Sequence, residues 1–479
     1  MFVGRERELQ DFQQLLRKKT SSLVTCQGRR RIGKSRFIRE CAREADVLLS
    51  FSGLPPRENQ TRQDQLDAFA EQLAAQTAAP KLRIESWAAA FQLLASQLPK
   101  SGTVIVLLDE ISWMGQGEPD FPGLLKNAWD HFFSHRPRMV VVLCGSVSSW
   151  IEKNILHNTG FVGRCSWQFH LGPLPLHHCS AFWGKSSGRV SSAEKLRLLA
   201  VTGGVPRYLE EIDPTRTAEQ NIASLCFNSG GMLFHEFEQL FQDIFSRKSA
   251  TYRSIVQTLA DGSKSIDAIS QALGRARGGS LGEALSDLEM SGFVSRDVPF
   301  VPSTGESRPR EVRYRIADNY LRFYLKYIDP VKDRIRKNRF RSVDLEMLDA
   351  WDTIVGLQFE SLVLSSLESL LPCIRLSPNL VLNAGPFVQK ATLRRKGCQI
   401  DLMIRTKRSL YLFEIKFRNR IGTEVADEMQ EKIRRLKLPT TQSIRTGLIY
   451  QGELSAELMA VDAFDYLVPA ESLLSVRGT

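Results

Sequence analysis

"SSLVTCQGRRRIGKSRFIRECAREA", Ser21 to Ala45, contains the pattern that decides the fold of the N-terminal part of the chain. "SSLVTCQ" has the composition of a short buried strand, and "KSRFIRECAREA" has apolar residues at helical spacing. Between them, Gly28–Ser35 fits the pattern G-x-x-x-x-G-K-[ST]. A strand before this loop and a helix after it are the context that a phosphate-binding loop requires. The stretch therefore predicts an α/β fold with such a loop at the end of a buried strand.

Each part of the loop has an expected contact with phosphate. Gly28 and Gly33 let backbone N–H groups approach phosphate oxygens, Lys34 places a positive charge beside the β- and γ-phosphates, and Ser35 offers a hydroxyl to Mg²⁺. The start of the helix adds its dipole. The residues predicted to bind a nucleotide here are Gly28, Arg29, Arg30, Arg31, Ile32, Gly33, Lys34 and Ser35.

A second buried strand, "VIVLLDE", ends in two adjacent acids that packing alone does not explain. Asp109 is predicted to hold Mg²⁺ together with Ser35, and Glu110 to activate the attacking water. "MVVVLCGS" is a further apolar strand, and the amphipathic helices "DAFAEQLAAQTAA" and "SWAAAFQLLASQL" lie between strands. Apolar strands alternating with helices indicate a parallel sheet covered on both faces.

These motifs together resemble the bacterial and archaeal P-loop ATPases of the AAA+/STAND kind. "FVGRERELQDFQQLL" resembles the N-terminal box that lies beside the nucleotide base, and Gly4 and Arg5 are its matching positions. "VVVLCGS" is similar to the sensor strand of the family, with Ser146 at the polar position. The preference for ATP over a guanine nucleotide is implied by the resemblance.

Two further segments carry the same resemblance. In "GFVGRCSWQFHLGPLP", Arg164 matches a phosphate-sensing or finger arginine, with an ordinary surface arginine as the alternative. "TGGVPRYL" resembles the lid motif, centred on Gly204, Pro206 and Arg207. From about Leu171 to Phe245 the apolar spacing is helical, which suits a lid.

Residues 251–316 show three apolar helical stripes followed by two strands, the outline of a winged helix. Winged helices often place their third helix in the major groove of DNA. Here that helix, "LGEALSDLEM", carries Glu283, Asp287 and Glu289 and no Lys or Arg. Acids would repel phosphate, so a connector or regulatory module is favoured over a sequence reader.

The strand "LYLFEIKF" places Glu414 and Lys416 on one face, and Asp401 lies on the preceding strand of the same predicted hairpin. Two carboxylates with a lysine can bind Mg²⁺, orient a water against a phosphodiester and steady the developing charge. Glu360 lies in the middle of the apolar stripe of the helix "WDTIVGLQFESLVLSSLESLL". A glutamate there is costly unless it is bound to something.

A helix Glu, a hairpin Asp and then E-x-K resemble the PD-(D/E)xK nuclease superfamily, with Glu360, Asp401, Glu414 and Lys416 at the matching positions. The resemblance implies catalysis by these four and metal binding by Asp401 and Glu414. Two alternatives remain: a Glu414–Lys416 surface pair on an edge strand, and a nuclease fold without activity. Gln399 stands where a second acid is often helpful. Gln430 and Lys432, on the following helix, are candidates to support the site, but the favoured interpretation is that both are ordinary helix-surface residues.

Composition sets outer limits on these interpretations. The net charge of +11 suits an acidic partner such as DNA. The eight cysteines form no C-x-x-C pair, the N-terminus lacks a signal peptide, and no apolar run is long enough to span a bilayer. We therefore expect a cytoplasmic protein with no membrane partner. A homo-oligomer is a possible state.

The expected fold class is α/β: a P-loop NTPase parallel sheet, a helical lid, a winged helix and a small α/β restriction-endonuclease-like domain. The predicted domains are 1–170 for the ATPase core, 171–248 for the lid, 249–320 for the winged helix, 321–344 for a basic linker and 345–479 for the nuclease-like domain. This order resembles archaeal-type ATPases with a C-terminal domain of unknown function. The resemblance implies an ATP-hydrolysing protein whose nucleotide state controls a C-terminal DNA nuclease-like module. The alternative is an ATP-driven signalling or scaffold switch with a non-catalytic C-terminal domain.

Overall fold

The structure, a computed structural model, describes residues 2–146, 148–245, 249–275, 278–340, 350–389, 396–436 and 442–475, together with positions 348 and 391. The chain divides into two compact units. Unit 1 consists of Met1–Gly172, Leu240–Arg247 and Ser286–Gly292, and unit 2 of Pro173–Gln239, Lys248–Leu285 and Phe293–Thr479. The predicted lid, winged helix and C-terminal domain thus fall mainly into one unit. The boundary predicted at 344 lies outside the described residues.

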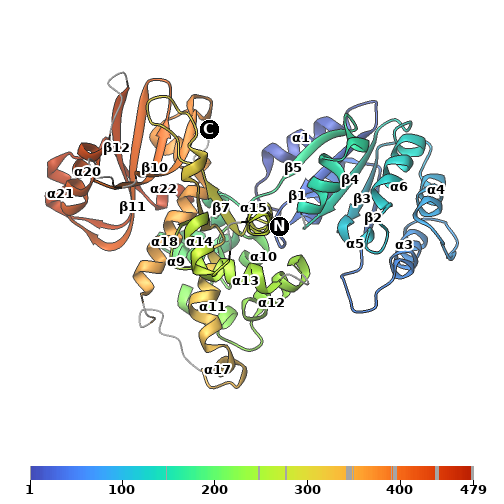
Figure 1. The fold of residues 1–479 in the computed structure, drawn as a ribbon, viewed down its shortest axis with the longest axis horizontal. Coiled ribbons are helices and arrows are strands. Elements are labelled where there is room, and N and C mark those ends of the chain that lie inside the picture. Colours follow the sequence, from blue (N-terminus) through green and yellow to red (C-terminus); the bar gives the residue numbers. More distant parts are fainter. Residues whose placement is uncertain are drawn as a thin grey trace. The chain divides into compact units, whose positions relative to one another are not determined.

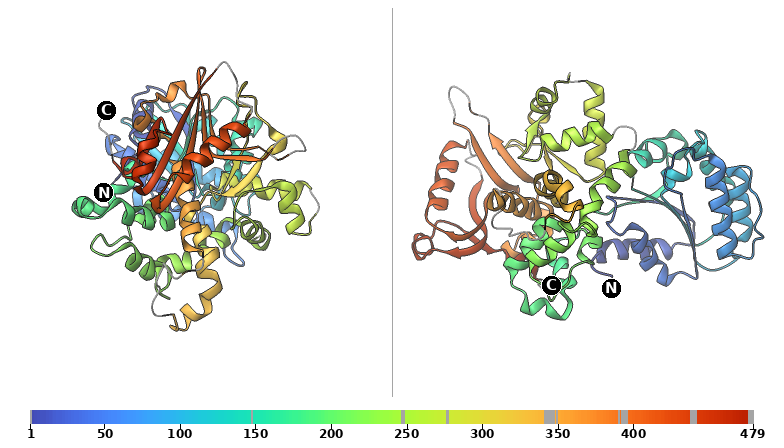
Figure 2. Two further views of the ribbon diagram at one scale, coloured as in Figure 1. Left: turned by 90° about the vertical axis from the view of Figure 1, so that its left-hand side faces the viewer. Right: turned by 90° about the horizontal axis from the view of Figure 1, so that it is seen from below.

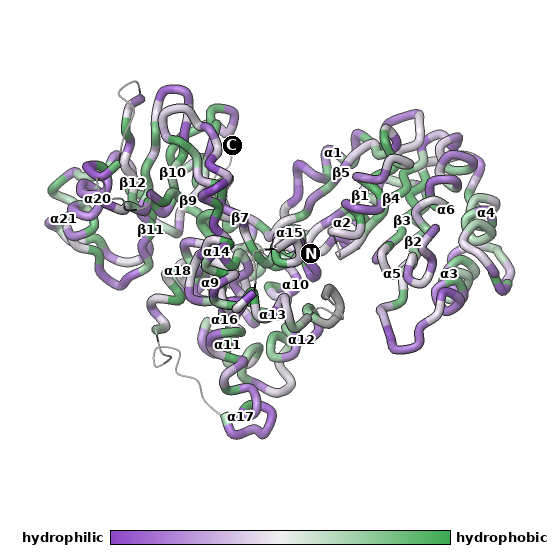
Figure 3. The backbone as a smooth tube through the Cα atoms, viewed as in Figure 1, coloured by the Kyte–Doolittle hydropathy of each residue, from purple (hydrophilic) through white to green (hydrophobic). Residues whose placement is uncertain are grey.

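Unit 1 is built on a five-stranded parallel sheet with the strand order β2-β3-β4-β1-β5 (Figure 1). The strands are β1 (Ser22–Gln27), β2 (Val47–Ser52), β3 (Val104–Asp109), β4 (Met139–Gly145) and β5 (Cys165–His170). Every residue of β1 and β4 is buried. Strands buried on both faces read as continuous apolar runs, which is why the sequence predicted them as parallel. These central strands are largely hydrophobic in Figure 3.

Helices cover both faces of this sheet. One core joins the sheet to α1 (Glu6–Leu16) and α2 (Lys34–Cys41), and the other joins it to α3 (Arg62–Gln76), α4 (Trp87–Gln97) and α6 (Phe121–Ala128). Two short helices, α5 (Ile111–Met114) and α7 (Ser148–Ile151), follow strands β3 and β4. The two-sided cover leaves the ends of the strands as the place where polar side chains can gather.

Unit 2 begins with the helices of the predicted lid. They are α8 (Leu176–Cys179), α9 (Ser192–Thr202), α10 (Pro206–Leu209), α11 (Ala218–Cys226) and α12 (Met232–Phe245), and the part of α12 from Leu240 onward belongs to unit 1. Gly204 is needed in the turn before α10, because a Cβ there would lie 2.1 Å from the carbonyl oxygen of Leu174. The lid motif is therefore held by a close backbone approach.

The predicted winged-helix segment follows, with helix α13 (Ser249–Thr258), strand β6 (Lys264–Ser265), helices α14 (Ile266–Ala272) and α15 (Gly279–Met290), and strands β7 (Val294–Asp297) and β8 (Arg313–Ile316). The part of α15 from Ser286 onward belongs to unit 1. The strands form an antiparallel sheet of order β6-β8-β7, and β6 is an addition to the predicted elements.

Phe300, in the loop between β7 and β8, belongs to the hydrophobic core of the C-terminal sheet. The Arg405 Nε of that sheet donates to the Pro302 carbonyl at 3.2 Å. The loop, which we call the wing, is therefore packed against the C-terminal sheet.

The first part of the segment predicted as a basic linker, residues 321–344, is helical and buried. It contains most of α16 (Asn319–Phe323) and all of α17 (Lys332–Arg336), and Leu321, Phe323 and Tyr324 are fully buried. Apolar side chains at helical spacing outweigh the charge run at this end, so the first part of the predicted linker is core. The described basic residues are also paired in part, since Lys332 forms an ion pair with Glu238.

The C-terminal part of unit 2 is a mixed five-stranded sheet of order β13-β12-β11-β10-β9 (Figure 2). Its strands are β9 (Asn383–Gln389), β10 (Cys398–Arg405), β11 (Ser409–Ile421), β12 (Ser443–Leu454) and β13 (Tyr466–Pro469). Pairing is antiparallel from β9 to β11 and parallel from β11 to β13. The associated helices are α18 (Trp351–Ser365), α19 (Leu367–Leu370), α20 (Glu424–Arg435), α21 (Ala456–Val461) and α22 (Glu471–Leu474). The predicted hairpin is thus β10–β11, in the middle of the sheet.

Among the described residues, no single helix has both the length and the apolar composition needed to cross a membrane. One bent pair, Trp351–Ser365 with Leu367–Ile374, meets the criterion by length and composition, with a bend of 82° between its halves. Phe359 and Leu370, one from each half, are fully buried inside the protein.

Candidate functional site

The phosphate-binding loop lies between β1 and α2, as the sequence predicted. Gly28 has φ +147°, and a Cβ there would lie 2.3 Å from the carbonyl oxygen of Leu171. Gly33 has φ +88° and is the N-cap of α2. Both positions therefore favour glycine, Gly28 because of the close approach and both because of their positive φ. Within the loop, Arg29 and Ile32 are buried, whereas Arg30 and Arg31 are partly exposed.

Lys34 begins α2, and its side chain is turned back under the loop. Its Nζ donates to the carbonyl oxygens of Gly28 at 3.0 Å and Arg29 at 3.2 Å and to Ser146 Oγ at 3.0 Å. The residue is 6% exposed. A buried ammonium whose three hydrogen bonds all go to neutral oxygens still lacks a compensating negative charge. The loop therefore fits a phosphate group beside Lys34.

Ser35 and Asp109 meet at the same end of the sheet. The Ser35 hydroxyl donates to Asp109 Oδ2 at 2.5 Å, and Asp109 is the last residue of β3. A hydroxyl and a carboxylate at this position are hard oxygen donors of the kind that Mg²⁺ takes. The predicted pair of metal ligands is thus in contact.

Glu110 is held beside Lys34 through Ser146. Glu110 has φ +49°, and its carboxylate accepts hydrogen bonds from Ser146 Oγ at 2.7 Å and Ser146 N at 3.1 Å. Since Lys34 also donates to Ser146 Oγ, one serine joins the predicted phosphate-binding lysine to the predicted general base. The left-handed conformation turns the chain sharply after β3, and this turn aims Glu110 at Ser146.

The remaining predicted nucleotide-site residues are held by local partners. Gly4 and Arg5 both have φ +70°, and the Arg5 guanidinium donates to the Gly172 carbonyl. Arg5 thereby joins the N-terminal box to the chain after β5. Pro206 is the first residue of α10, and Arg207 forms ion pairs with Glu210 and Glu211 within unit 2. Their roles in nucleotide binding stay predictions.

Arg164 forms a bidentate ion pair with Asp130, through Nε at 2.7 Å and Nη2 at 2.9 Å. This arginine holds the pKa of Asp130 well below its usual range. The pair occupies the Nε–Nη2 edge of the guanidinium, so a phosphate would have to meet the Nη1 side unless the pair opens.

In unit 2, the predicted hairpin brings Asp401, Glu414 and Lys416 together. Asp401 Oδ2 accepts a hydrogen bond from Ile415 N at 2.9 Å, and Lys416 Nζ donates to Glu414 Oε2 at 2.9 Å. Glu414 is fully buried, and β11 lies between β10 and β12. The alternative of a surface pair on an edge strand is therefore wrong.

Glu360, on α18, completes the set. Burial, and next the charge of Asp401, raise the pKa of Glu360 to about 7. Burial, and next the charge of Glu414, raise the pKa of Asp401 to about 6. Burial lowers the pKa of Lys416, but the carboxylates of Glu414 and Asp401 outweigh it and the pKa is raised. The charge of Asp401 acts on Glu360, which places Glu360 near the hairpin group; we call these four residues the C-terminal cluster.

Lys432, on α20, is a member of the cluster that the sequence interpretation placed on the surface. Its Nζ donates to Glu414 Oε1 at 2.5 Å, so each oxygen of Glu414 receives one lysine. Lys432 follows buried Val425 and Met429 at helical spacing, and this periodicity could have placed it on the inner face. Gln430 is exposed, as predicted.

The cluster contains carboxylates, which are the donors that a divalent cation takes, but both oxygens of Glu414 are bound to lysine. Within the described ranges, no group of three or more His, Cys, Asp or Glu residues is placed to hold a metal ion. Burial, and next the negative charge of Glu414, raise the pKa of Asp401, and a divalent cation beside the two carboxylates would offset both effects. The residues fit a two-carboxylate cation site, provided that a lysine releases one oxygen of Glu414.

The N-terminal part of the chain is similar to a known family of ATPase domains. Residues 2–212 match the family described as an ATPase domain predominantly from Archaea. The uncharacterised protein MJECL04 of Methanocaldococcus jannaschii is 24% identical over 450 residues, covering 91% of this chain and 92% of that protein.

Solved structures show weaker likenesses. The Walker-type ATPase PABY2304 of Pyrococcus abyssi has a TM-score of 0.47 and 17% identity, over 68% of this chain and 96% of that one. The ORC2 protein of Aeropyrum pernix has a TM-score of 0.38 and 14% identity, over 70% and 93%. TM-scores this low do not by themselves establish a common fold. The family match and the geometry of the loop agree with each other: residues 2–212 form a P-loop ATPase domain of the archaeal type.

Proposed function

We propose that this protein binds and hydrolyses ATP with Mg²⁺, and that its nucleotide state regulates a C-terminal, metal-dependent nuclease-like module that acts on DNA. The observation that supports the second half of the proposal is the cluster of Glu360, Asp401, Glu414 and Lys416 in one place. The net charge of +11 favours a polyanionic partner.

At the ATPase site, each residue has a separate task. Lys34 gives up its contacts with neutral oxygens to neutralise the charge on the terminal phosphates, and backbone N–H groups of the loop surround their oxygens. Ser35 and Asp109 would hold Mg²⁺, which supplies charge neutralisation on the phosphate oxygens. Glu110 accepts the proton of the attacking water, and Ser146 keeps its carboxylate in position.

At the C-terminal cluster, Asp401 and Glu414 would hold a divalent cation, which supplies a Lewis acid for a phosphodiester oxygen. Lys416 stays charged beside these carboxylates and is placed to stabilise negative charge that develops on the phosphate. Glu360 and Asp401, with raised pKa values, can take up a proton near neutral pH.

Coupling between the two activities is proposed from the packing of the lid. Leu176 N donates to Ser366 Oγ at 3.2 Å, and Ser180 Oγ donates to the Leu474 carbonyl at 2.9 Å. These bonds join the lid helix α8 to α22 and to the turn between α18 and α19. Because the lid and the C-terminal sheet lie in one compact unit, a lid that responds to nucleotide would carry the C-terminal cluster with it.

A second candidate function is favoured by the lysines at Glu414. Both of its oxygens are bound to lysine, as in a structural ion-pair network. In that case the C-terminal domain would be a non-catalytic interaction module, and the protein an ATP-driven switch.

One assay separates the two. Wild type, Asp401→Ala and Lys34→Ala are incubated with linear, single-stranded and branched DNA, in Mg²⁺ or Mn²⁺, with and without ATP. The proposal expects cleavage by wild type, its loss in Asp401→Ala, and an altered ATP response in Lys34→Ala. Asp427→Ala, an exposed aspartate on α20, is the matched control and should cleave as wild type does. Failure to cleave any of the substrates would favour the switch, and cleavage that is identical in Lys34→Ala with and without ATP would refute the coupling.

A further inference from the structure

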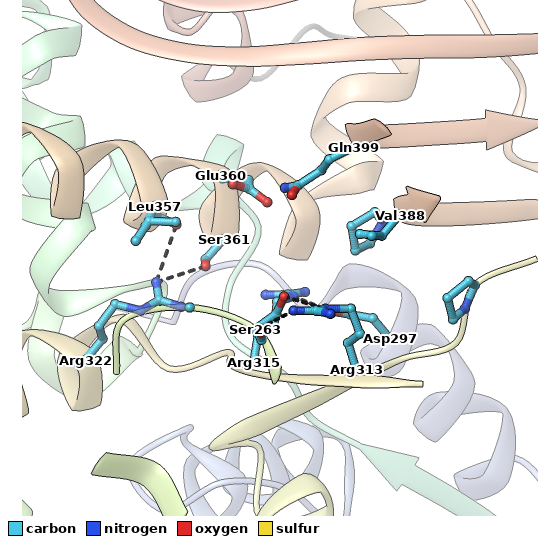
Figure 4. Close-up of a pocket in the computed structure, with 13 residues that line it drawn as sticks. Ser263, Asp297, Arg313, Arg315, Arg322, Leu357, Glu360, Ser361, Val388 and Gln399 are labelled. Carbon is cyan, nitrogen blue, oxygen red and sulfur yellow. Dashed lines mark hydrogen bonds and ion pairs between the residues drawn. The ribbon is translucent and has the colours of Figure 1, made fainter. Parts of the chain in front are cut away.

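A pocket of about 270 Å³ lies beside Glu360 in unit 2 (Figure 4). Its walls come from three parts of the unit: the predicted winged-helix segment, the helices α16 and α18, and the strands β9 and β10. Figure 4 shows Glu360 and Gln399 on one wall and Arg313 and Arg315 on the wall opposite. The pocket is thus a space between the predicted nuclease residues and a set of arginines that the nuclease motif does not include.

The most informative lining residue is Arg322. Its side chain is 2% exposed, and its two terminal nitrogens donate to Gln358 Oε1 at 2.6 Å and to the Ile316 carbonyl at 2.9 Å. The third nitrogen, Nε, is buried and has no hydrogen-bond partner among the residues that the structure describes. A buried guanidinium N–H without an acceptor is costly. The Nε is closed off from the pocket, so what Arg322 adds to the lining is the positive charge of its guanidinium.

Two further arginines keep free donor capacity toward the same space. Arg315 uses Nε for Asp297, at 2.9 Å. Arg313 uses Nε for Ser263 Oγ, at 3.0 Å, and Nη2 for the Ser263 carbonyl, which leaves its Nη1 without a hydrogen bond to any residue that the structure describes. Three guanidinium groups face two carboxylates, those of Asp297 and Glu360, and one of these carboxylates is already paired. The lining therefore carries an excess of positive charge, in a planar form that binds phosphate through paired hydrogen bonds.

We propose that this pocket binds a phosphate monoester and presents it beside Glu360. The group would come from the end of a nucleic-acid strand or from a free mononucleotide. A pocket of about 270 Å³ with walls from three parts of the unit can receive a chain end, whereas an internal phosphodiester needs room for the strand to continue in both directions. The identification of strand ends as the substrate rests on the proposed nuclease function, but phosphate binding itself does not.

Binding is tested on the full chain carrying Lys34→Ala, so that the phosphate-binding loop does not contribute, and in wild type saturated with a non-hydrolysable ATP analogue. Thymidine 5′-monophosphate and thymidine are titrated by calorimetry. Single-stranded oligothymidylates with a 5′-phosphate, a 3′-phosphate or hydroxyl ends are compared by fluorescence anisotropy in EDTA. We expect the monophosphate to bind and thymidine not to bind. For a strand-end site, one phosphorylated oligonucleotide should bind at least about tenfold more tightly than the hydroxyl form. A preference seen only with the free monophosphate would identify the mononucleotide as the ligand.

Arg313→Gln and Arg315→Gln are the test variants, because they are less buried than Arg322 and less able to disturb folding. Each should weaken phosphate-dependent binding about tenfold. Arg445→Gln, an exposed arginine paired with Asp465 in the same unit, is the matched control and should bind as the parent does. The proposal that this pocket binds phosphate would be refuted if affinity were the same with and without the phosphate, or if both test variants bound as tightly as the parent.

The same variants distinguish this inference from the nuclease proposal. If cleavage is lost in Asp401→Ala while calorimetry and anisotropy show no binding that depends on the phosphate, the nuclease stands and the pocket inference fails. If phosphate binding follows the arginines while no DNA is cut, the pocket stands and the nuclease proposal fails.

Discussion

Ser146 is the residue on which the two halves of the ATPase site depend. Its hydroxyl accepts from Lys34 and donates to Glu110, and its backbone N–H donates to Glu110 as well. Phosphate arriving beside Lys34 would draw the ammonium away from Ser146. The serine would then be held by Glu110 alone, so that the position of Glu110, the proposed general base, would respond to occupancy of the loop.

Replacing this serine should separate hydrolysis from binding. We expect Ser146→Ala to lower kcat for ATP hydrolysis about tenfold, since it removes one hydrogen bond to a charged group that orients the base. The dissociation constant for ATP should change much less, because the loop itself is intact. Both are measured by steady-state hydrolysis and by titration with a fluorescent ATP analogue. Ser134→Ala, whose hydroxyl donates only to the Asp130 carbonyl, is the control; an equal loss there would contradict the assignment.

Glu414 supports stability as well as its proposed chemistry. It is fully buried between two lysine ammonium groups that are themselves 16% and 21% exposed. Glu414→Gln would leave both ammonium groups without their carboxylate, at a cost of about 2–3 kcal/mol in the free energy of unfolding, because the lysines keep some access to water. The measurement is the thermal unfolding temperature of the variant, in EDTA.

Glu431→Gln provides the comparison for this change. Glu431 lies on the same helix as Lys432 and pairs with Arg434 and Arg435 at the surface. Exposed pairs contribute little, so no shift in the unfolding temperature is expected. Equal shifts in the two variants would mean that burial of the Glu414 network carries no special energetic weight.

Among the elements, the turn from β1 into α2 is the most constrained. Gly28 combines φ +147° with a close approach to Leu171, so that any side chain would displace the strand end or the loop. We expect Gly28→Ala to lower the unfolding temperature of unit 1 and to abolish measurable ATP binding, as judged by calorimetry and by titration.

Gly123→Ala is the matched control for that substitution. Gly123 lies in helix α6, is exposed and has open space where a Cβ would be. Alanine there should stabilise the protein by up to about 1 kcal/mol, since glycine is a poor helix residue. A destabilised Gly123→Ala with normal Gly28→Ala would contradict the account of the loop.

The third helix of the predicted winged helix is the element whose chemistry argues against DNA reading. Glu283 and Glu289 are exposed on α15, where they would face phosphate with the wrong charge. The wing, too, is occupied, because Phe300 lies in the core of the C-terminal sheet and Arg405 binds the Pro302 carbonyl. Both features favour the connector role over a DNA-reading role.

At the level of the whole chain, unit 2 joins segments that the sequence suggested were separate domains. The wing contributes Phe300 to a core shared with Phe387, Ile400 and Met403 of the C-terminal sheet. Buried Asn319, just after β8, donates to the Gln358 carbonyl of α18 at 3.2 Å and to the Leu199 carbonyl of α9 at 3.4 Å. The lid, the predicted winged helix and the C-terminal sheet should therefore lose structure together.

Phe300→Ala tests this. It should destabilise unit 2 by about 3 kcal/mol, as the loss of a buried aromatic side chain does. Hydrogen exchange should speed up in peptides of β10 and β11 as well as in those of β7 and β8. Leu380→Ala, at a leucine that is 58% exposed, should leave exchange unchanged. Faster exchange confined to the wing would show that the segments are independent.

The sequence by itself determined the ATPase half, because its motifs are local. Gly28, Lys34 and Ser35 act within one turn of chain, and Asp109 and Glu110 end a strand whose apolar run places them at the same edge. Glu360, Asp401, Glu414 and Lys416 could be nominated from periodicity. Only the tertiary structure decided that Glu414 is fully buried in a central strand, that Lys432 shares it, and that Arg313, Arg315 and Arg322 line a pocket beside Glu360. Local spacing cannot reveal these facts, because burial and charge partners come from segments far apart in the chain, brought together only by the packing of the wing and the helices around one sheet.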